Sequence, residues 1–121
     1  MSALDIQIGG EHYKGHHQPI QLITELHLNF FQGNILKYPS RFKGKNGIED
    51  LNKAIHYCQL GAELSPENTA KFDRDTAIHY VVANALDDTF VDFIEQICDQ
   101  NWIWCIEYIN KIKDVEYGSE S

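Results

Sequence analysis

The chain has 121 residues, of which 43% are hydrophobic and 12% aromatic, and its net charge at pH 7 is −8. This length suits one domain, and the apolar content is enough for a core, which excludes a wholly disordered chain. The N-terminus lacks a signal-peptide pattern and no segment reaches the ~18 apolar residues of a membrane span, so we expect a cytoplasmic protein without a membrane partner.

The first half of the chain predicts an irregular segment followed by helices. Residues 1–18 are rich in glycine and histidine and show no apolar period. Pro19 then stands at a first helical position, and the apolar residues after it predict a helix over 19–28. A second helix is predicted over 30–42, bent late by Pro39. Its apolar stripe would consist of Phe31, Ile35, Tyr38 and Phe42.

The remaining pattern is also helical. The loop KGKNG precedes a third helix that should end near Ser65 and Pro66, and three later apolar stretches predict three more helices. We therefore expect an all-α, compact single domain of five to six short helices. Within it, 19–64 would form a core with a basic ligand patch, 65–117 would supply C-terminal helices packed on that core, and 118–121 would be a tail.

The three cysteines of the chain are Cys58, Cys98 and Cys105. Their number is odd and their spacing contains no CxxC pair. These features predict buried free thiols and argue against a disulfide framework or a zinc knuckle.

Basic residues concentrate between Gly33 and Tyr57. Five of the ten Lys and Arg residues of the chain lie here: Lys37, Arg41, Lys43, Lys45 and Lys53. Only Glu49 and Asp50 oppose them, in a chain that is acidic overall. A local positive patch on an acidic protein favours a small phosphate-bearing ligand, because a long nucleic acid would be repelled beyond the patch. The sequence therefore predicts a nucleotide site and no long nucleic-acid partner.

On the second predicted helix, Asn34, Lys37 and Arg41 are spaced so that they project together. Like charges at this spacing repel by about 0.2–0.5 kcal/mol, and a bound phosphate would turn that repulsion into binding. Arg41 could grip two phosphate oxygens, Lys37 could act as a point charge, and the amide of Asn34 could orient a sugar or base. The alternative is a solvated basic face.

On the third predicted helix, Asp50, Lys53 and Tyr57 repeat that spacing. Lys53 would meet a second phosphate, and Asp50 would hold a magnesium ion or pair with Arg41. The alternative is a simple helix pair between Asp50 and Lys53.

Histidines cluster in the N-terminal segment GGEHYKGHHQP, at His12, His16 and His17. This segment could contact a nucleotide through His12 and Tyr13 or be an exposed loop. The spacing alone does not supply the three or four ligands that a metal needs, so no metal site is predicted. We expect His27, His56 and His79 to be ordinary surface or core histidines.

A row of acidic residues, Asp88, Asp92, Glu95 and Asp99, follows the spacing of one helix face. Such rows can bind magnesium in nucleotide pyrophosphohydrolases, but no matching carboxylate pair occurs elsewhere, which favours a solvated acidic face. The chain also lacks the GxxxxGK[ST] loop, which excludes a P-loop kinase.

Several elements occur together in one order: GGEHY at 9–13, QPIQLI at 18–23, and GNILKY and DLNKAIHY between 33 and 57. They resemble a small bacteriophage domain of largely unassigned function, similar to the core of the P-loop-less nucleotide kinase of T-odd coliphages. The resemblance covers about residues 9–60. It marks His12, Tyr13, Gly33, Asn34, Lys37, Tyr38, Arg41, Lys45, Asp50, Leu51, Lys53 and Ala54.

The resemblance implies a phage protein of the host cytoplasm that phosphorylates (deoxy)nucleoside monophosphates, with Mg²⁺ and ATP. Phosphoryl transfer depends mostly on positioning and charge neutralisation, and Asp50 or His12 would orient or deprotonate the acceptor. The nucleotide would be bound by Tyr13, Asn34, Lys37, Tyr38, Arg41, Lys45, Lys53 and Tyr57.

The sequence leaves two other functions open. One is a non-catalytic binder that sequesters a nucleotide, for instance a host defence signal. The other is Mg²⁺-dependent nucleotide hydrolysis through Asp92 and Glu95. Three or four cations on short helices can hardly surround a nucleotide, so we expect a homo-oligomer that shares the site.

Overall fold

The computed structural model of the protein describes residues 3–5 and 17–118. These residues form two short 3₁₀ turns and six α-helices, with no strand among them. In chain order the elements are η1 (Ala3–Asp5), α1 (Pro19–Glu25), α2 (Phe30–Arg41), η2 (Phe42–Gly44), α3 (Ile48–Leu64), α4 (Arg74–Ala83), α5 (Phe90–Cys98) and α6 (Trp102–Tyr117). The predicted all-α single domain is confirmed.

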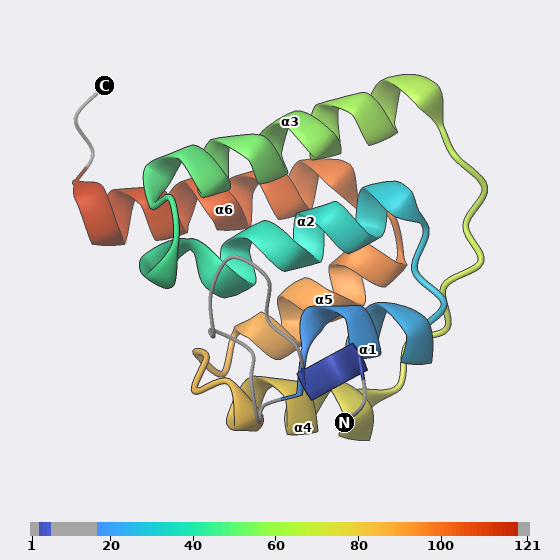
Figure 1. Ribbon diagram of the computed structural model, residues 1–121. Coiled ribbons are helices and arrows are strands. Elements are labelled where there is room, and N and C mark those ends of the chain that lie inside the picture. The colour runs from blue at the N-terminus through green and yellow to red at the C-terminus, as the bar shows by residue number, and fades with distance from the viewer. Residues whose placement is uncertain (1–2, 6–16, 119–121) are drawn as a thin grey trace.

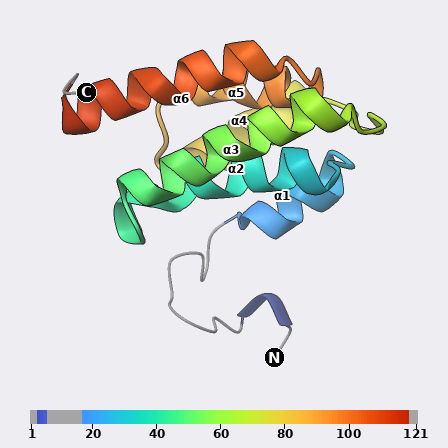
Figure 2. The same ribbon diagram turned by 90° about the horizontal axis from the view of Figure 1, so that it is seen from above.

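The helices pack around the antiparallel pair formed by α2 and α3 (Figure 1). Seen from above, α3 runs between α2 and α6, while α1 covers the outer side of α2 (Figure 2). Helix α5 contacts α2, α4 and α6, and α4 also contacts α1. Within the described ranges, no helix has the length and apolar character needed to cross a membrane.

Side-chain caps determine where several helices begin. The Asn29 carboxamide accepts a hydrogen bond from the Gln32 backbone N–H and the Gln32 side chain accepts one from the Asn29 N–H, a capping box at the start of α2. Asp73 caps α4 and Asn101 caps α6 in the same acceptor role.

Helix boundaries differ from the predicted ones at the end of α1. This helix ends at Glu25, three residues before the predicted end, because His27 adopts a left-handed conformation with φ of 58° and Asn29 already caps α2. Helix α2 continues past Pro39 to Arg41. Helix α3 ends at Leu64, as predicted, where Ser65 has φ of 47°.

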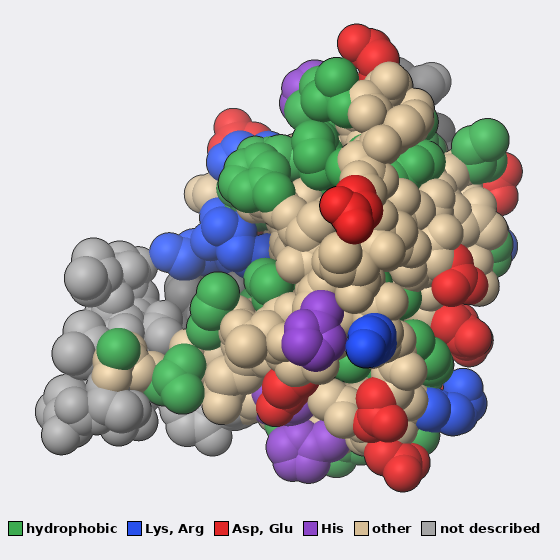
Figure 3. All heavy atoms as spheres, turned by 90° about the vertical axis from the view of Figure 1, so that its right-hand side faces the viewer, with side chains coloured by type: hydrophobic (Ala, Val, Ile, Leu, Met, Phe, Trp, Pro, Cys, Tyr) green, Lys and Arg blue, Asp and Glu red, His purple; other side chains and the backbone are tan. Residues whose placement is uncertain are grey.

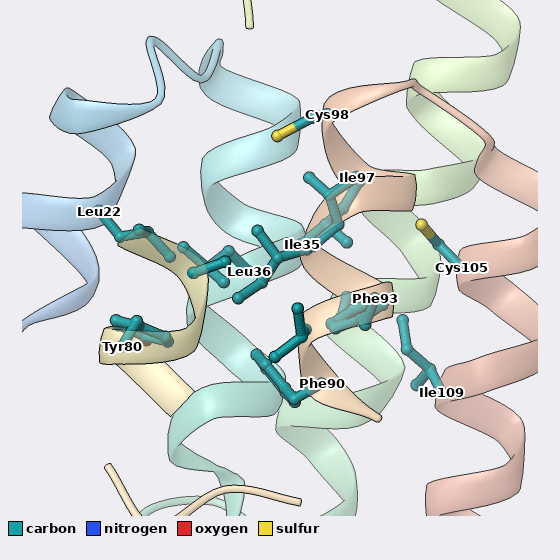
Figure 4. Packing of buried hydrophobic residues seen from close by; sticks show 14 of the residues in the cluster. Leu22, Ile35, Leu36, Tyr80, Phe90, Phe93, Ile97, Cys98, Cys105 and Ile109 are labelled. Carbon is teal, nitrogen blue, oxygen red and sulfur yellow. The ribbon is translucent and has the colours of Figure 1, made fainter. Parts of the chain in front are cut away.

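The core is built from the facing sides of α2, α3, α5 and α6, with Leu22 and Tyr80 added from α1 and α4 (Figure 4). Cys58, Cys98 and Cys105 are buried free thiols, as predicted. The apolar stripe of α2 is rotated from the predicted one. Leu36 is fully buried beside Ile35, whereas Tyr38 is only half-buried and packs against the edge of the core.

A buried amide joins α2 to the end of α5. Gln32 is completely buried, and its Nε2 donates to the Ile97 carbonyl at 3.0 Å and to Asn68 Oδ1 at 2.9 Å. Asn68 in turn donates to the Cys98 carbonyl at 2.8 Å. These bonds add side-chain donors to the carbonyls of Ile97 and Cys98 at the C-terminus of α5, where the Ile97 carbonyl also accepts the Gln100 backbone N–H. They also attach the segment before α4 to the first half of the chain.

Candidate functional site

Three cationic side chains lie against the ring of Tyr38. Lys37 Nζ and Arg41 Cζ are each 4.8 Å from the ring centroid, and Lys53 Nζ is 5.4 Å from it. The first two residues belong to α2, and the pairing of α2 with α3 brings in Lys53. The negative face of an aromatic ring attracts cations, so Tyr38 helps to hold the three charges together. We call Lys37, Tyr38, Arg41 and Lys53 the Tyr38 cluster.

The cluster carries more positive charge than its neighbours neutralise. Arg41 is paired with Asp50, and Lys53 lies 3.9 Å from the exposed carboxylate of Glu49. In the part of the chain that the structure describes, no carboxylate lies within ion-pair distance of Lys37. The space around Tyr38 therefore favours an anion.

Asp50 holds the guanidinium of Arg41 in place. Its carboxylate is fully buried, and Oδ2 lies 3.4 Å from Arg41 Nε. The same carboxylate accepts hydrogen bonds from Arg41 Nη2 at 3.5 Å and from the Asn46 backbone N–H at 3.2 Å. Arg41 Nε is itself buried without a hydrogen bond. Of the alternatives for Asp50, the structure shows the pair with Arg41, and Lys53 pairs with Glu49 instead of Asp50.

A row of aromatic rings leads away from the cluster. The rings of Tyr38 and Tyr57 are stacked, with centroids 6.2 Å apart and planes 13° apart. Phe30 meets Tyr57 in an edge-to-face contact at 5.7 Å, and 68% of Phe30 is exposed. We call Phe30, Tyr57 and Tyr38 the aromatic row. It connects the first turn of α2 to the Tyr38 cluster.

A cleft of about 340 Å³ opens beside the C-terminal end of α2, and Arg41 contributes to both this cleft and the Tyr38 cluster. The volume of this cleft falls in the range of small-molecule sites. Lys43 stands at its wall and pairs with Glu116 of α6 at 3.4 Å. The cleft is lined by Pro39, Ser40, Arg41, Phe42, Lys43, Gly44, Asn84, Ala85, Leu86, Asp87, Phe90, Tyr108, Ile112 and Glu116.

The structure brings together six of the predicted site residues: Lys37, Tyr38, Arg41, Asp50, Lys53 and Tyr57. Asn34 lies on α2 and donates its amide to the Phe30 carbonyl at 2.9 Å. Lys45 is exposed in the turn before α3. His12 and Tyr13 lie outside the described residues.

The other predicted groups lie on separate surfaces. His17 Nε2 is 2.7 Å from Glu25 Oε1, and its Nδ1 is 2.8 Å from Nδ1 of His79 on α4. In the acidic row, Asp88, Asp92 and Asp99 are exposed and Glu95 is half-buried. Among the residues that the structure describes, no three His, Cys, Asp or Glu side chains are arranged to hold a metal ion.

Sequence patterns did not indicate Phe30 or Asn46. Phe30 precedes the predicted apolar stripe, and its contact with Tyr57 depends on how α2 and α3 align. Asn46 was part of a predicted loop, and its backbone N–H binds Asp50 only because the turn folds back over α3. The position of Phe30 directly after the N-cap residue Asn29 is the sequence signal that could have identified it.

The space-filling view in Figure 3 shows several basic side chains beside apolar ones at the left edge of the face, next to an acidic group, while other basic side chains lie among the acidic ones nearer the centre and at the lower right.

The model of a family described as a protein of unknown function, DUF3310, matches residues 9–59. The matched segment contains α1, α2 and the first part of α3, and therefore all of the Tyr38 cluster and the aromatic row. No curated protein and no solved structure matches the chain.

Proposed function

We propose that this protein binds a nucleotide and that the Tyr38 cluster holds its phosphate group. The observation that carries the proposal is the placement of three cations, from two helices, around one ring, with Lys37 lacking a counterion among the described residues. Holding like charges this close costs free energy in the absence of a ligand. An anion between α2 and α3 would remove that cost.

The three side chains suit a phosphate in complementary ways. The planar guanidinium of Arg41 can donate two parallel hydrogen bonds to phosphate oxygens, and Asp50 fixes its orientation. Lys37 and Lys53 approach the same ring from different helices and can act as point charges on the remaining oxygens. A phosphate would therefore be held from several sides.

Isothermal titration calorimetry with nucleoside mono-, di- and triphosphates tests the proposal. A charge-assisted hydrogen bond is worth roughly 1.5–3 kcal/mol, so Lys37→Ala should weaken binding at least about tenfold. Lys111→Ala is the matched control, because Lys111 is an exposed lysine on α6. The proposal fails if the wild-type protein binds no member of the panel, or if Lys37→Ala binds as tightly as wild type.

A second candidate function is phosphoryl transfer to a nucleoside monophosphate. The observation that favours it is the cleft next to the cluster, because Arg41 contributes to both and a second phosphate-bearing ligand could lie in the cleft. Arg41 would then neutralise charge between a donor and an acceptor phosphate, which is the main requirement of this reaction. ATP would be the donor, and Mg²⁺ would enter bound to its phosphates.

Mass spectrometry of nucleoside monophosphates incubated with ATP and Mg²⁺ separates the functions. Diphosphate formation that disappears in Lys37→Ala and Arg41→Ala would support a kinase. Binding without any product would support a sequestering protein. Hydrolysis that is lost on replacing Asp92 and Glu95, with binding retained, would support the pyrophosphohydrolase.

A further inference from the structure

We infer that the exposed ring of Phe30 stacks on the base of the bound nucleotide, so that the aromatic row, besides the cations, selects the ligand. This inference rests on the proposed nucleotide binding. It adds a base-recognising position to a site otherwise defined only by charge.

The exposure of Phe30 is the first observation. Phe30 is the first residue of α2, and 68% of it is exposed to solvent. A single exposed apolar residue needs no explanation. Phe30, however, is not isolated, because its ring contacts Tyr57, and Tyr57 is stacked on Tyr38 at the centre of the cation cluster. The exposed ring is therefore continuous with the proposed phosphate site.

The spacing along the row is the second observation. The steps from Phe30 to Tyr57 and from Tyr57 to Tyr38 are 5.7 and 6.2 Å between ring centroids, and the cations lie beyond, around Tyr38. A nucleoside with its phosphates is an elongated ligand with a flat apolar group at one end and negative charge at the other. Its base could lie on Phe30 while its terminal phosphate reaches Lys37 and Arg41.

The mutual contacts of the row favour this role. Tyr57 is held between Phe30 and Tyr38, so the row needs little ordering when a ligand arrives. Every base has a π-face, so any base can stack on an aromatic side chain. Purines offer the larger face, so purine nucleotides should bind more tightly than pyrimidine nucleotides.

The test compares a ligand that has a base with one that lacks it. Calorimetry would measure binding of ADP, GDP, CDP and UDP, and of inorganic pyrophosphate, to wild type, Phe30→Ala and Lys37→Ala. Phe30→Ala should weaken the nucleoside diphosphates about tenfold and leave pyrophosphate unchanged. Lys37→Ala should weaken all five ligands.

Val82→Ala is the matched control, because Val82 is 74% exposed on α4, a different helix. Circular dichroism would show that each variant is folded. Unchanged nucleotide binding in Phe30→Ala, with Lys37→Ala impaired, would overturn the base contact and leave the proposed function intact. A wild-type protein that binds none of the five ligands would overturn the proposed function itself.

Discussion

The carboxylate of Asp50 on α3 is completely buried, and its Oδ2 lies 3.4 Å from Nε of Arg41 at the end of α2. Removing one partner of a buried ion pair leaves the other charge uncompensated. This pair therefore joins the two helices of the candidate site and at the same time holds the guanidinium that we propose as a phosphate ligand.

Asp50→Asn should lower the free energy of unfolding by about 3 kcal/mol, because the neutral amide keeps the shape of the carboxylate but leaves Arg41 unpaired. Urea unfolding followed by circular dichroism measures the change. Glu49→Gln is the control, since its pair with Lys53 is exposed and should contribute less than about 1 kcal/mol. Equal stability losses in the two variants would contradict the assigned role of Asp50.

Pyrophosphate should stabilise the folded protein if the Tyr38 cluster binds phosphate groups. A ligand at one hundred times its Kd adds about 2.7 kcal/mol to the free energy of unfolding. Thermal unfolding at increasing pyrophosphate concentrations, with sodium chloride at matched ionic strength as the reference, would detect it. The double variant Lys37→Ala, Lys53→Ala should lose this stabilisation. A Tm that rises equally in both proteins would show that the ion acts elsewhere.

Gly61→Ala should destabilise the packing of α3 on α6. A Cβ at Gly61 would lie 2.7 Å from the Trp102 ring, so the indole would have to move. Overpacking of this kind costs about 1–3 kcal/mol. Gly33→Ala is the matched change, because its Cβ would come no closer than 3.2 Å, to the terminal methyl carbon of Ile23. Its gain in helix propensity of up to about 1 kcal/mol should offset that contact. Chemical denaturation of both variants would measure their free energies of unfolding, and Gly61→Ala should be the less stable.

Burial, together with the carboxylates of Asp99 and Glu95, raises the pKa of Cys98 to about 12. A hydrogen bond with Cys58 and burial raise the pKa of Cys105 as well. The unfolded thiols titrate near pH 8.5, so above this pH the folded state binds more protons and the free energy of unfolding falls as pH rises. Urea unfolding at pH 7.5 and 9.5 should show the decrease, and Cys98→Ala should show less of it.

The same burial should protect the thiols from alkylation, because the thiolate is the reactive form. At pH 8, iodoacetamide should label none of the three cysteines in the folded protein and all three in urea. Mass spectrometry counts the labels. Rapid labelling of the folded protein would show that its thiols are accessible.

The period of apolar residues predicted five to six α-helices, and the described residues form six, each with residues that the core buries. It was insufficient for details that depend on tertiary packing. The rotation of α2 that buries Leu36 and leaves Tyr38 half-buried depends on how α2 packs against its neighbours, among them α3 and α5. Local spacing on α2 placed Lys37 and Arg41 together, and both lie at the Tyr38 ring. The position of Lys53 at that ring and the contact between Phe30 and Tyr57 depend on how α2 and α3 align, which local spacing does not predict.

The buried amide of Gln32 has a consequence for how the chain can be divided. The family match ends at residue 59, inside α3, yet Gln32 within that match donates to the Ile97 carbonyl far outside it. Two residues beyond the match, Gly61 lies directly against the Trp102 ring. We therefore expect that the matched segment does not fold on its own. It carries the candidate site but contacts the C-terminal helices through its interior, so a fragment ending at residue 59 should expose Ile35 and Leu36 and aggregate.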